Sequence, residues 1–400
     1  MGAVLANVLV TYGWCRTAYI AVRALTARGH EVYSCSHLLP SMTGWSRFCR
    51  GSASVSNPFE APAAFTKEIN ELVERWDIDV VLPGHEDALV LREFEHLLPD
   101  GLLLACPSQQ ALIKGLDKIK VTRIAQAAGV SVPETICPSS VEEALDVAPA
   151  LGFPLVLKLA HSNSAKGVAI VRDLDELKTA LMERFVAAAI AAGDHFPYLQ
   201  KFCEGVAVGC CFMARKGHID GWFGERYLRS KSDGIGTSVF REPFPSAKLR
   251  LQAEKIVRAL EWDGIGHFDF IENREDGDLV LLEMNPRPWG AINLSFVNGF
   301  DFIGATVAHA LGEKDLTGFF NSHPDSELRS IWGVGEGIRF AHLLGTCQFS
   351  AAAKVPFEVF KSLKNSRFDD LIWHDPLPFL GEAICYGKIF FGSGEVITPL

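Results

Sequence analysis

The chain of 400 residues carries 38 Lys and Arg against 48 Asp and Glu, a formal net charge of −10. This negative balance argues against a nucleic-acid partner, whose phosphates the chain would repel. Hydrophobic residues make up 48% of the sequence, which is enough for buried cores in two or three domains. The longest apolar runs, such as 186–192, are too short to span a bilayer, so we expect no membrane segment.

The start of the chain and its cysteines bear on where the protein works. Residues 1–7, Met-Gly-Ala-Val-Leu-Ala-Asn, lack the basic stretch that opens a signal peptide. The ten cysteines include no Cys-x-x-Cys pair, so neither a disulfide framework nor a zinc site is expected. We therefore expect a cytoplasmic protein with reduced cysteines.

Strands and helices alternate through the first hundred residues. Short apolar runs predict strands, and segments of helical periodicity between them predict helices. The expected strands are 3–11, 31–36, 78–83 and 102–106, and the expected helices are 17–28, 61–76 and 87–98. This alternation predicts a parallel, Rossmann-like sheet for residues 1–107. The turn 11–15 contains one glycine rather than G-x-G-x-x-G, which argues against a dinucleotide site there.

Two turns at the carboxyl ends of these strands are candidate substrate contacts. Loops at that edge of a parallel sheet favour ligands. Gly13 to Thr17 and Gly84 to Asp87 therefore either form part of a substrate wall or serve the fold alone.

A helix from Leu116 to Ala128, carrying Lys118, and a strand over 153–159 follow. Lys158 lies in the nearly all-apolar strand Leu-Val-Leu-Lys-Leu. A buried ammonium group needs a partner anion, and a phosphate oxygen would serve. The alternative is a lysine whose charged head reaches water from the strand edge. The next loop, 161–167, offers hydroxyls, backbone N–H groups and a glycine, a composition that suits phosphate binding.

The second half of the chain is expected to alternate helices with antiparallel strands. The expected elements are a helix at 173–191, strands at 196–202, 206–214 and 218–227, a helix at 247–261, strands at 264–272 and 279–285, and a helix at 300–311. Residues 319–400 predict a mixture of short helices and strands.

The strands 264–272 and 279–285 predict a hairpin whose turn is 273–278. The midpoint of Asp269 and Glu283 falls inside that turn, so the two carboxylates are expected opposite one another.

Three polar side chains end the second strand of this hairpin. Glu283 and Asn285 share a face because side chains alternate along a strand. Pro286 and Pro288 hold the chain extended, which keeps Arg287 near that face. Two acids and an amide at one place indicate a Mg²⁺ site, since this ion takes oxygen ligands and bridges to phosphates. The alternative is an edge hairpin with solvated acids.

The run Glu283-x-Asn285-x-Arg287, preceded by an acid on the neighbouring strand, resembles the metal hairpin of the ATP-grasp superfamily. The order of the other motifs over residues 3–311 is similar to that of its amino-acid ligases and carbamoyl-phosphate-synthase-like domains. The resemblance implies a mixed α/β and α+β fold, with a Rossmann-like N-terminal domain and ATP held between two subdomains that contain antiparallel sheets. The implied domains are 1–107, 108–198, 199–312 and a small C-terminal region, 313–400.

The resemblance also implies roles for individual residues. Lys118 and Lys158 would bind the phosphates of ATP, and Arg287 would meet an acyl phosphate as the catalytic residue. The implied ligands of two Mg²⁺ ions, with Mn²⁺ as an alternative, are Asp269, Glu283 and Asn285. The other implied ATP contacts are Ser162, Ser164 and Gly167 in the loop, and Gln200, Lys201, Phe202, Cys203 and Glu204 at the adenine hinge. Glu204 is included because Ala207 stands where the family often has a ribose-binding acid.

Five further residues are candidate substrate contacts. Arg226, Arg229 and Arg241 would each suit a second carboxylate or phosphate on a substrate, and the alternative for each is a surface arginine. Trp289 and Gly290 complete the Pro-Arg-Pro-Trp-Gly run beside the catalytic candidate.

Together these assignments imply an ATP-dependent carboxylate–amine ligase that forms an amide or peptide bond through an acyl phosphate and releases ADP and phosphate. Its partners would be a small carboxylate and an amine, and a homodimer is the first oligomeric state to expect. One alternative keeps the ATP site but uses a thiol, carbon or carbamate acceptor. The other is a nucleotide-binding regulatory protein without catalytic activity.

Overall fold

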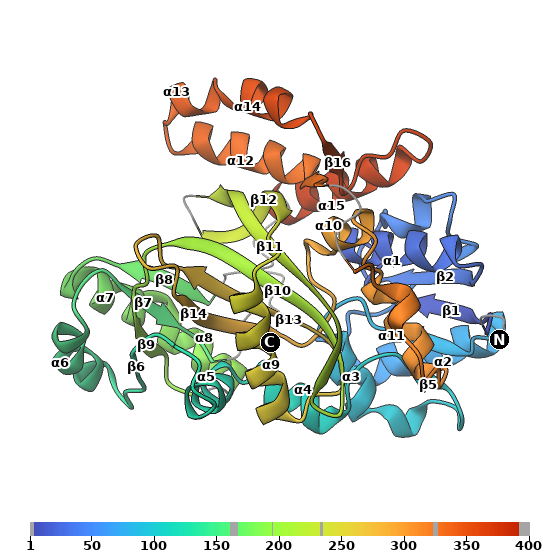
Figure 1. Ribbon diagram of the computed structural model, residues 1–400, viewed down its shortest axis with the longest axis horizontal. Helices are drawn as coiled ribbons and strands as arrows, with labels where there is room; N and C mark the ends of the chain where they lie inside the picture. Colours follow the sequence, from blue (N-terminus) through green and yellow to red (C-terminus); the bar gives the residue numbers. More distant parts are fainter. Residues whose placement is uncertain (1–3, 161–166, 194, 233–234, 323–326, 392–400) are drawn as a thin grey trace.

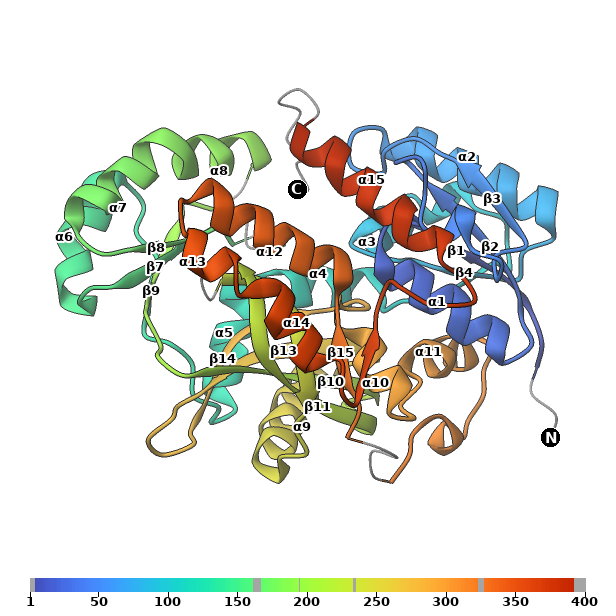
Figure 2. The same cartoon turned by 90° about the horizontal axis from the view of Figure 1, so that it is seen from above.

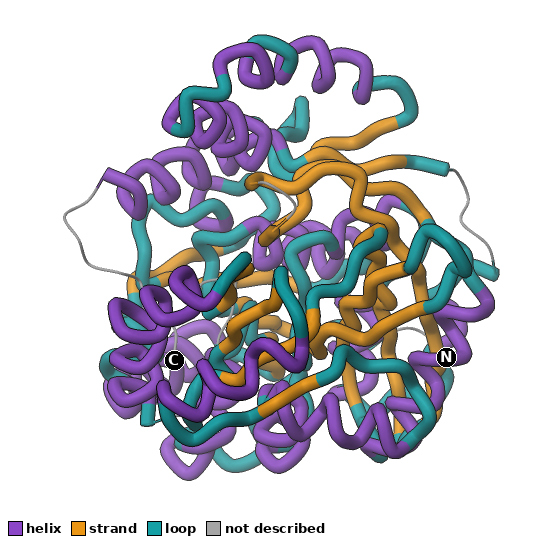
Figure 3. Tube along the Cα trace, turned by 90° about the vertical axis from the view of Figure 1, so that its left-hand side faces the viewer, coloured by secondary structure: helices purple, strands orange, loops and turns teal. Residues whose placement is uncertain are grey.

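Three β-sheets organise the computed structural model, which describes residues 4–160, 167–193, 195–232, 235–322 and 327–391. Figure 1 shows the four-stranded sheet at the left, the seven-stranded sheet in the centre and the five-stranded sheet at the right. Helices lie around the outside of these strands (Figure 3). No helix in the described ranges is both long and apolar enough to cross a membrane.

The N-terminal sheet is parallel, with the strand order β3-β2-β1-β4-β5. Its strands are β1 Asn7–Val10, β2 Glu31–Ser36, β3 Gly51–Ser54, β4 Val80–Leu82 and β5 Leu103–Leu104, and its helices are α1 Arg16–Ala27, α2 Pro62–Trp76 and α3 Asp87–Glu93. On β1, Val8 and Val10 enter one core, with Ile20 of α1, whereas Leu9 packs on the other face with Phe65 of α2. Helices cover both faces, which explains why the central runs 8–10 of β1 and Val80–Leu82 of β4 are apolar throughout.

The second sheet is antiparallel, with the order β6-β9-β7-β8. Its strands are β6 Thr135–Ile136, β7 Leu155–Lys158, β8 Val168–Val171 and β9 Tyr198–Lys201, and the helices of this region are α4 Gln109–Leu116, α5 Lys118–Ala127, α6 Val141–Leu151, α7 Leu174–Ala180 and α8 Val186–Ala192. On β7, Leu155 and Leu157 pack against the α6 and α7 core. Because side chains alternate, Lys158 points to the opposite face.

The central sheet has the order β14-β13-β10-β11-β12-β15-β16. Its strands are β10 Val206–Arg215, β11 His218–Ser232, β12 Ile235–Pro243, β13 Gly264–Glu272, β14 Leu279–Asn285, β15 Arg329–Ile331 and β16 Ser366–Phe368. One face packs under α5 and α9 Ala247–Leu260, and Phe212 and Phe268 belong to that core. The other face carries Cys211 and Met213 and packs with α10 Ile292–Val297 and α11 Phe302–Ala310.

The C-terminal part of the chain completes this sheet and then reaches back to the N-terminal one. β15 pairs with β12, and the helices α12 Gly333–Gly345, α13 Phe349–Ala352, α14 Val355–Ser362 and α15 Leu377–Phe391 follow. Figure 2 shows α15 lying along the N-terminal region, apart from α13 and α14. Hydrogen bonds join α15 to the loop after β2: the Cys385 thiol donates to the Pro40 carbonyl at 2.9 Å, and Lys388 Nζ donates to the Leu39 carbonyl at 2.6 Å.

Several sequence-based expectations are confirmed. The N-terminal sheet is parallel, the strand 264–272 has the expected bounds, and the second hairpin strand begins at Leu279 as expected. β3 and β12 were not expected, because Gly-Ser-Ala-Ser has no large apolar side chain and β12 contains Gly236 near its start. The domain boundary at 312 stays a prediction, and β15 lies beyond it while bonding to β12.

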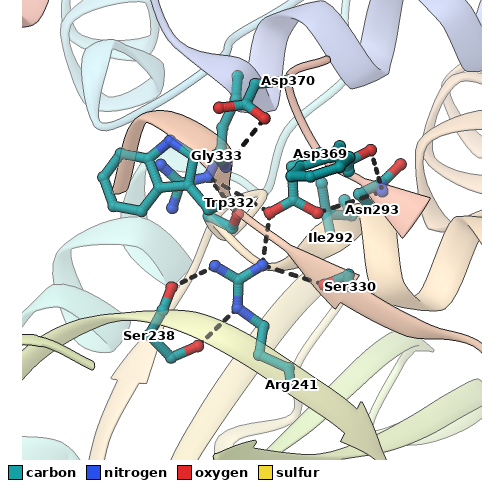
Figure 4. Close-up of polar contacts among 12 residues, drawn as sticks. Ser238, Arg241, Ile292, Asn293, Ser330, Trp332, Gly333, Asp369 and Asp370 are labelled. Atoms are coloured by element: carbon teal, nitrogen blue, oxygen red, sulfur yellow. Dashed lines mark hydrogen bonds and ion pairs between the residues drawn. The ribbon is translucent and has the colours of Figure 1, made fainter. Parts of the chain in front are cut away.

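Arg241 occupies the junction between β12, β15 and the C-terminal segment (Figure 4). Its guanidinium is fully buried and bonds to Asp369 at 2.5 Å and to the Ser330 hydroxyl at 3.1 Å, and two further donors reach Ser238. Asp369 also accepts from the Asn293 amide at 3.2 Å. The prediction that Arg241 binds substrate is therefore wrong, because protein groups take up its donors and exclude it from solvent.

Replacing Arg241 should destabilise the fold strongly. The Arg241→Met variant leaves Asp369 buried with a weaker set of partners, and breaking such a pair costs about 3–5 kcal/mol of unfolding free energy. Urea denaturation measures the loss. As a matched control, Arg250→Met removes an exposed pair with Glu254 within one helix, worth about 0.5 kcal/mol. Equal stabilities of the two variants would contradict the structural role.

Candidate active site

The hairpin of β13 and β14 brings the predicted acids together. Asp269 is the cross-strand partner of Glu283, and His267 is the partner of Asn285. The expected register is therefore confirmed, with a β-bulge immediately after Asp269. The Asn285 amide donates to Asp269 Oδ2 at 3.0 Å. Three oxygen-bearing side chains thus share one face of the sheet.

Two lysines from neighbouring elements face this cluster. Lys118, the first residue of α5, lies with its Nζ 3.3 Å from Glu283 Oε2 and is 7% exposed. Burial alone would raise the pKa of Glu283, but the Lys118 and Lys158 ammonium groups bring it below its ordinary value. Burial raises the pKa of Asp269 above its ordinary value. Glu283 is therefore the more firmly ionised acid of the pair.

Lys158 ends β7 on the face away from the α6 and α7 core. It is 6% exposed, so the alternative of a lysine reaching into water from a strand edge does not hold. Burial lowers its pKa to about 8, and the nearby Lys118 adds to this effect while Glu283 opposes it. Two buried ammonium groups thus lie beside the acid pair, and groups of this kind suit the phosphate oxygens of a nucleotide.

Arg287 follows the hairpin and reaches the N-terminal region. Its Nε lies 3.4 Å from Glu86 Oε1, in the turn after β4. That turn is fixed from within, because buried Asp87 accepts from the backbone N–H of His85 at 2.9 Å and from the Thr11 hydroxyl. The turn that was a candidate substrate contact therefore does lie beside the catalytic candidate.

The implied adenine hinge lies at the end of β9. The Gln200 side chain is buried and its amide donates to the Thr135 hydroxyl at 3.0 Å, while Lys201 and Glu204 are exposed. Cys203 Sγ lies 3.7 Å from the Lys201 carbonyl, and Phe202 is half-buried. Of the implied phosphate loop, Gly167 is buried and its carbonyl accepts from the Leu159 N–H at 2.9 Å. Ser162 and Ser164 lie outside the described residues.

Two of the proposed substrate arginines pair with carboxylates of the protein. Arg226 pairs with Glu272 at 2.8 Å and stacks on Phe244, on the face of the sheet opposite Asp269. Arg229 donates to Glu336 of α12 at 2.9 Å and to Ser362 of α14. These contacts do not favour a substrate role, because Arg226 faces away from Asp269 and Arg229 is held by Glu336 and Ser362; the assignment of both stays a prediction.

Trp289 and Gly290 are likewise packed rather than presented to a ligand. Trp289 is 3% exposed and stacks on His267 with the ring centroids 5.3 Å apart. The Gly290 carbonyl accepts from Arg16 Nε at 2.8 Å, and a Cβ at this glycine would lie 2.6 Å from the Arg16 guanidinium. Trp289 supports the His267 ring and Gly290 contacts Arg16, so these contacts do not favour their assignment as substrate contacts.

Sequence reasoning missed three residues that touch the acid cluster. Glu225 and Tyr227 come from β11 and His267 from β13, and all three bond to one another. Glu225 and His267 also gather with Cys211, with ligand atoms within 4.8 Å of one another. The alternation of β11 was the available signal, since Glu225 and Tyr227 share a face as Glu283 and Asn285 do.

Comparisons of the sequence with known proteins point to an ATP-binding domain. Residues 117–207 match the family described as "Carbamoyl-phosphate synthase L chain, ATP binding domain". Over this stretch the chain is therefore similar to the ATP-binding domain of that family. It is 29% identical over 257 residues to human mitochondrial pyruvate carboxylase, covering 60% of this chain and 20% of that protein. It is 25% identical over 308 residues to the bifunctional MurC/Ddl enzyme of Chlamydia pneumoniae, covering 69% of this chain and 36% of that one.

Solved structures show that the ATP-grasp fold extends through most of the chain. Biotin carboxylase from Campylobacter jejuni superposes with a TM-score of 0.65 and 19% identity, covering 77% of this chain and 71% of that one. The carboxyaminoimidazole ribonucleotide synthase of Aspergillus clavatus, solved with ATP, has a TM-score of 0.58 and 17% identity, covering 79% of each chain. The chain spans only a fifth of the length of the pyruvate carboxylases it matches.

The side chains of the hairpin fit divalent metal ions. Asp269 and Glu283 supply carboxylate oxygens, Asn285 can supply an amide oxygen, and all three face one side of the hairpin. An oxygen-only donor set of this size suits Mg²⁺, which keeps some waters and shares the phosphates of a nucleotide. The number of ions and the use of Mn²⁺ stay predictions.

Nucleotide binding should weaken as the pH rises through about 8. Lys158 titrates near that value in the free protein, and only its protonated form attracts the triphosphate. The affinity for a non-hydrolysable ATP analogue should therefore be full about one pH unit below that pKa and fall toward pH 9.5, by up to about tenfold per pH unit. Calorimetric titration measures this. Lys158→Arg stays charged and should flatten the profile. A flat profile for the unmodified protein would contradict the assignment.

Proposed function

We propose that this protein is an ATP-dependent carboxylate–amine ligase that forms an amide or peptide bond through an acyl phosphate. One observation carries the proposal: an acid pair in cross-strand register, Asp269 and Glu283, faces two buried lysines. The curated relatives that support a ligase or carboxylase share only part of the chain, so the reaction is argued from the residues.

The chemistry follows from the inertness of a carboxylate toward amines, since oxide is a poor leaving group. Transfer of the γ-phosphoryl group of ATP to the carboxylate oxygen gives an acyl phosphate and ADP. The amine then attacks the acyl carbon, and phosphate leaves. Phosphoryl transfer needs positioning and charge neutralisation more than covalent participation by the protein. Lys118 and Lys158 supply that neutralisation from fixed, buried positions.

Bound Mg²⁺ would add to this neutralisation and orient the phosphates, held by Asp269, Glu283 and Asn285. Glu283 is both one of these ligands and the partner of Lys118, so its ionised carboxylate would bind the metal and the lysine together.

Arg287 is the residue we assign to the acid substrate. Its planar guanidinium suits a carboxylate, an acyl phosphate and a tetrahedral oxyanion in succession. In the structure it contacts the Glu86 carboxylate, which occupies the place that a substrate carboxylate would take. An acid substrate would therefore displace Glu86, and the released carboxylate would then stand beside the site where an ammonium substrate must arrive.

A second candidate reaction uses bicarbonate as the acid and a ring or amide nitrogen as the acceptor. The matches to pyruvate carboxylase and to carboxyaminoimidazole ribonucleotide synthase favour it. ADP release that requires bicarbonate and no other acid would select this reaction. ADP release that requires an organic acid would select the amide ligase. Nucleotide binding without any turnover would favour a nucleotide-binding regulatory protein without catalytic activity.

Replacing Glu283 should abolish turnover. A thermal-shift screen of amino acids and amines with Mg²⁺ and a non-hydrolysable ATP analogue would identify a substrate pair, and ADP release would then be measured. Glu283→Gln removes a metal ligand and the partner of Lys118, so the rate should fall by at least about 10²-fold. Glu275→Gln, in the exposed turn of the same hairpin, is the control. Full activity of Glu283→Gln would refute the metal hairpin.

Replacing Arg287 should separate binding from chemistry. Arg287→Met should lower kcat by about 10²–10³-fold, because it removes a charge that stabilises the transition state. The affinity for the ATP analogue should stay within about twofold, since the lysines hold the phosphates. Arg274→Met, in the exposed hairpin turn, is the matched control. A large loss of nucleotide affinity with an intact kcat would show that Arg287 belongs to the nucleotide site.

A further inference from the structure

A buried polar network lies beside the acid pair, and the proposed reaction assigns no role to it. It consists of Glu225 and Tyr227 on β11 and His267 on β13, on the face of the sheet that carries Asp269. Glu225 and His267 are almost fully buried. A polar group in such a place is costly unless its hydrogen bonds are made, so the network needs an explanation.

The network meets the candidate metal ligands through His267 and Tyr227. His267 Nδ1 lies 3.6 Å from Asp269 Oδ2 and 3.5 Å from the Asn285 amide nitrogen. The Tyr227 hydroxyl donates to Asp269 Oδ1 at 2.8 Å. The same hydroxyl lies 3.1 Å from Glu225 Oε1 and 3.1 Å from His267 Nε2. Asn285 occupies the other oxygen of the carboxylate, Oδ2, at 3.0 Å. Asp269 is therefore held from both sides.

The proton count assigns a direction to these bonds. A tyrosine hydroxyl has one proton, so it can donate to Asp269 or to Glu225 but not to both. His267 Nε2 lies 3.1 Å from Glu225 Oε1 and can donate its own proton there. With the His267 proton on Glu225 Oε1, the Tyr227 proton is available to Asp269, while Glu225 Oε2 is buried without a hydrogen-bond partner among the described residues.

A glycine makes the network possible. Gly209 on β10 is the cross-strand partner of both Glu225 and Asp269. The flanking strands β11 and β13 lie about 9–10 Å apart, which is twice the strand spacing. Their side chains reach one another across β10 because Gly209 has no side chain between them. A Cβ at Gly209 would lie 2.5 Å from His267 Nε2 and 2.6 Å from the Tyr227 hydroxyl. Any side chain at this position would push the two apart.

From this geometry we propose that Tyr227, oriented by Glu225 and His267 over Gly209, is a positioning residue for the metal site. By occupying Asp269 Oδ1 it fixes the rotation of the carboxylate, so that Oδ2 faces Glu283 and Asn285. Groups that hold a metal-binding side chain in this way set how well the ligand is prepared for the ion. The inference rests on the proposed function, because it takes Asp269 as a metal ligand.

The test is the affinity for Mn²⁺, which takes the same oxygen ligands as Mg²⁺ and is read directly by electron paramagnetic resonance. The full-length protein is titrated with Mn²⁺ in the presence of a non-hydrolysable ATP analogue. Tyr227→Phe removes only the hydroxyl and should weaken Mn²⁺ binding about 10- to 100-fold. Gly209→Ala keeps every polar group but separates Tyr227 from His267, and should weaken it as well. Tyr33→Phe, a stacked tyrosine of the N-terminal sheet, is the matched control.

A separate titration with the ATP analogue alone distinguishes positioning from general damage. The analogue should bind Tyr227→Phe with unchanged affinity in metal-free buffer, since the lysines are untouched. Wild-type Mn²⁺ affinity in Tyr227→Phe would overturn the inference while leaving the proposed function intact, and so would an equal loss of metal-free analogue binding. Absence of nucleotide-dependent Mn²⁺ binding in the unmodified protein would overturn both.

Discussion

The structure depends on opposite charges held together, with two buried ammonium groups beside two partly exposed carboxylates. Glu283 lies 3.3 Å from Lys118, and Lys158 is buried close enough to influence the pKa of Glu283. Two ammonium groups and two carboxylates in one place are stable only with close geometry and further partners. Each comes from a different element: α5, β7, β13 and β14. The site therefore forms where α5 and β7 meet the hairpin of β13 and β14, and separating these elements would leave the charges unpaired.

The C-terminal segment has a structural part in this arrangement. Arg16, which begins α1, bonds to the Gly290 carbonyl at 2.8 Å and lies 3.9 Å from both Asp369 and Glu382. It also stacks on Trp332 at 3.7 Å. The N-terminal sheet, the chain after the metal hairpin and the C-terminal helices thus meet at one guanidinium. This junction joins the N-terminal sheet to the chain that follows Arg287.

The sequence predicted the parts of the fold and site that rest on local rules. Turn length places Asp269 opposite Glu283, alternation places Asn285 with Glu283, and an apolar strand around Lys158 indicates burial. The arginines could not be assigned in this way. Arg229 and Arg241 find their partners, Glu336 and Asp369, about a hundred residues away, and no local pattern shows such pairing. The role of Gly209 was equally hidden, since it depends on which strands flank β10.

The central claim is that Asp269 and Glu283 hold a divalent ion against a triphosphate. Crystals grown with Mn²⁺ and a non-hydrolysable ATP analogue would test it through the anomalous scattering of manganese. The account predicts an anomalous peak in direct coordination with carboxylate oxygens of both residues, with the phosphates within reach of Lys118 and Lys158. An analogue bound in the site without such a peak, or with manganese bound elsewhere, would contradict it.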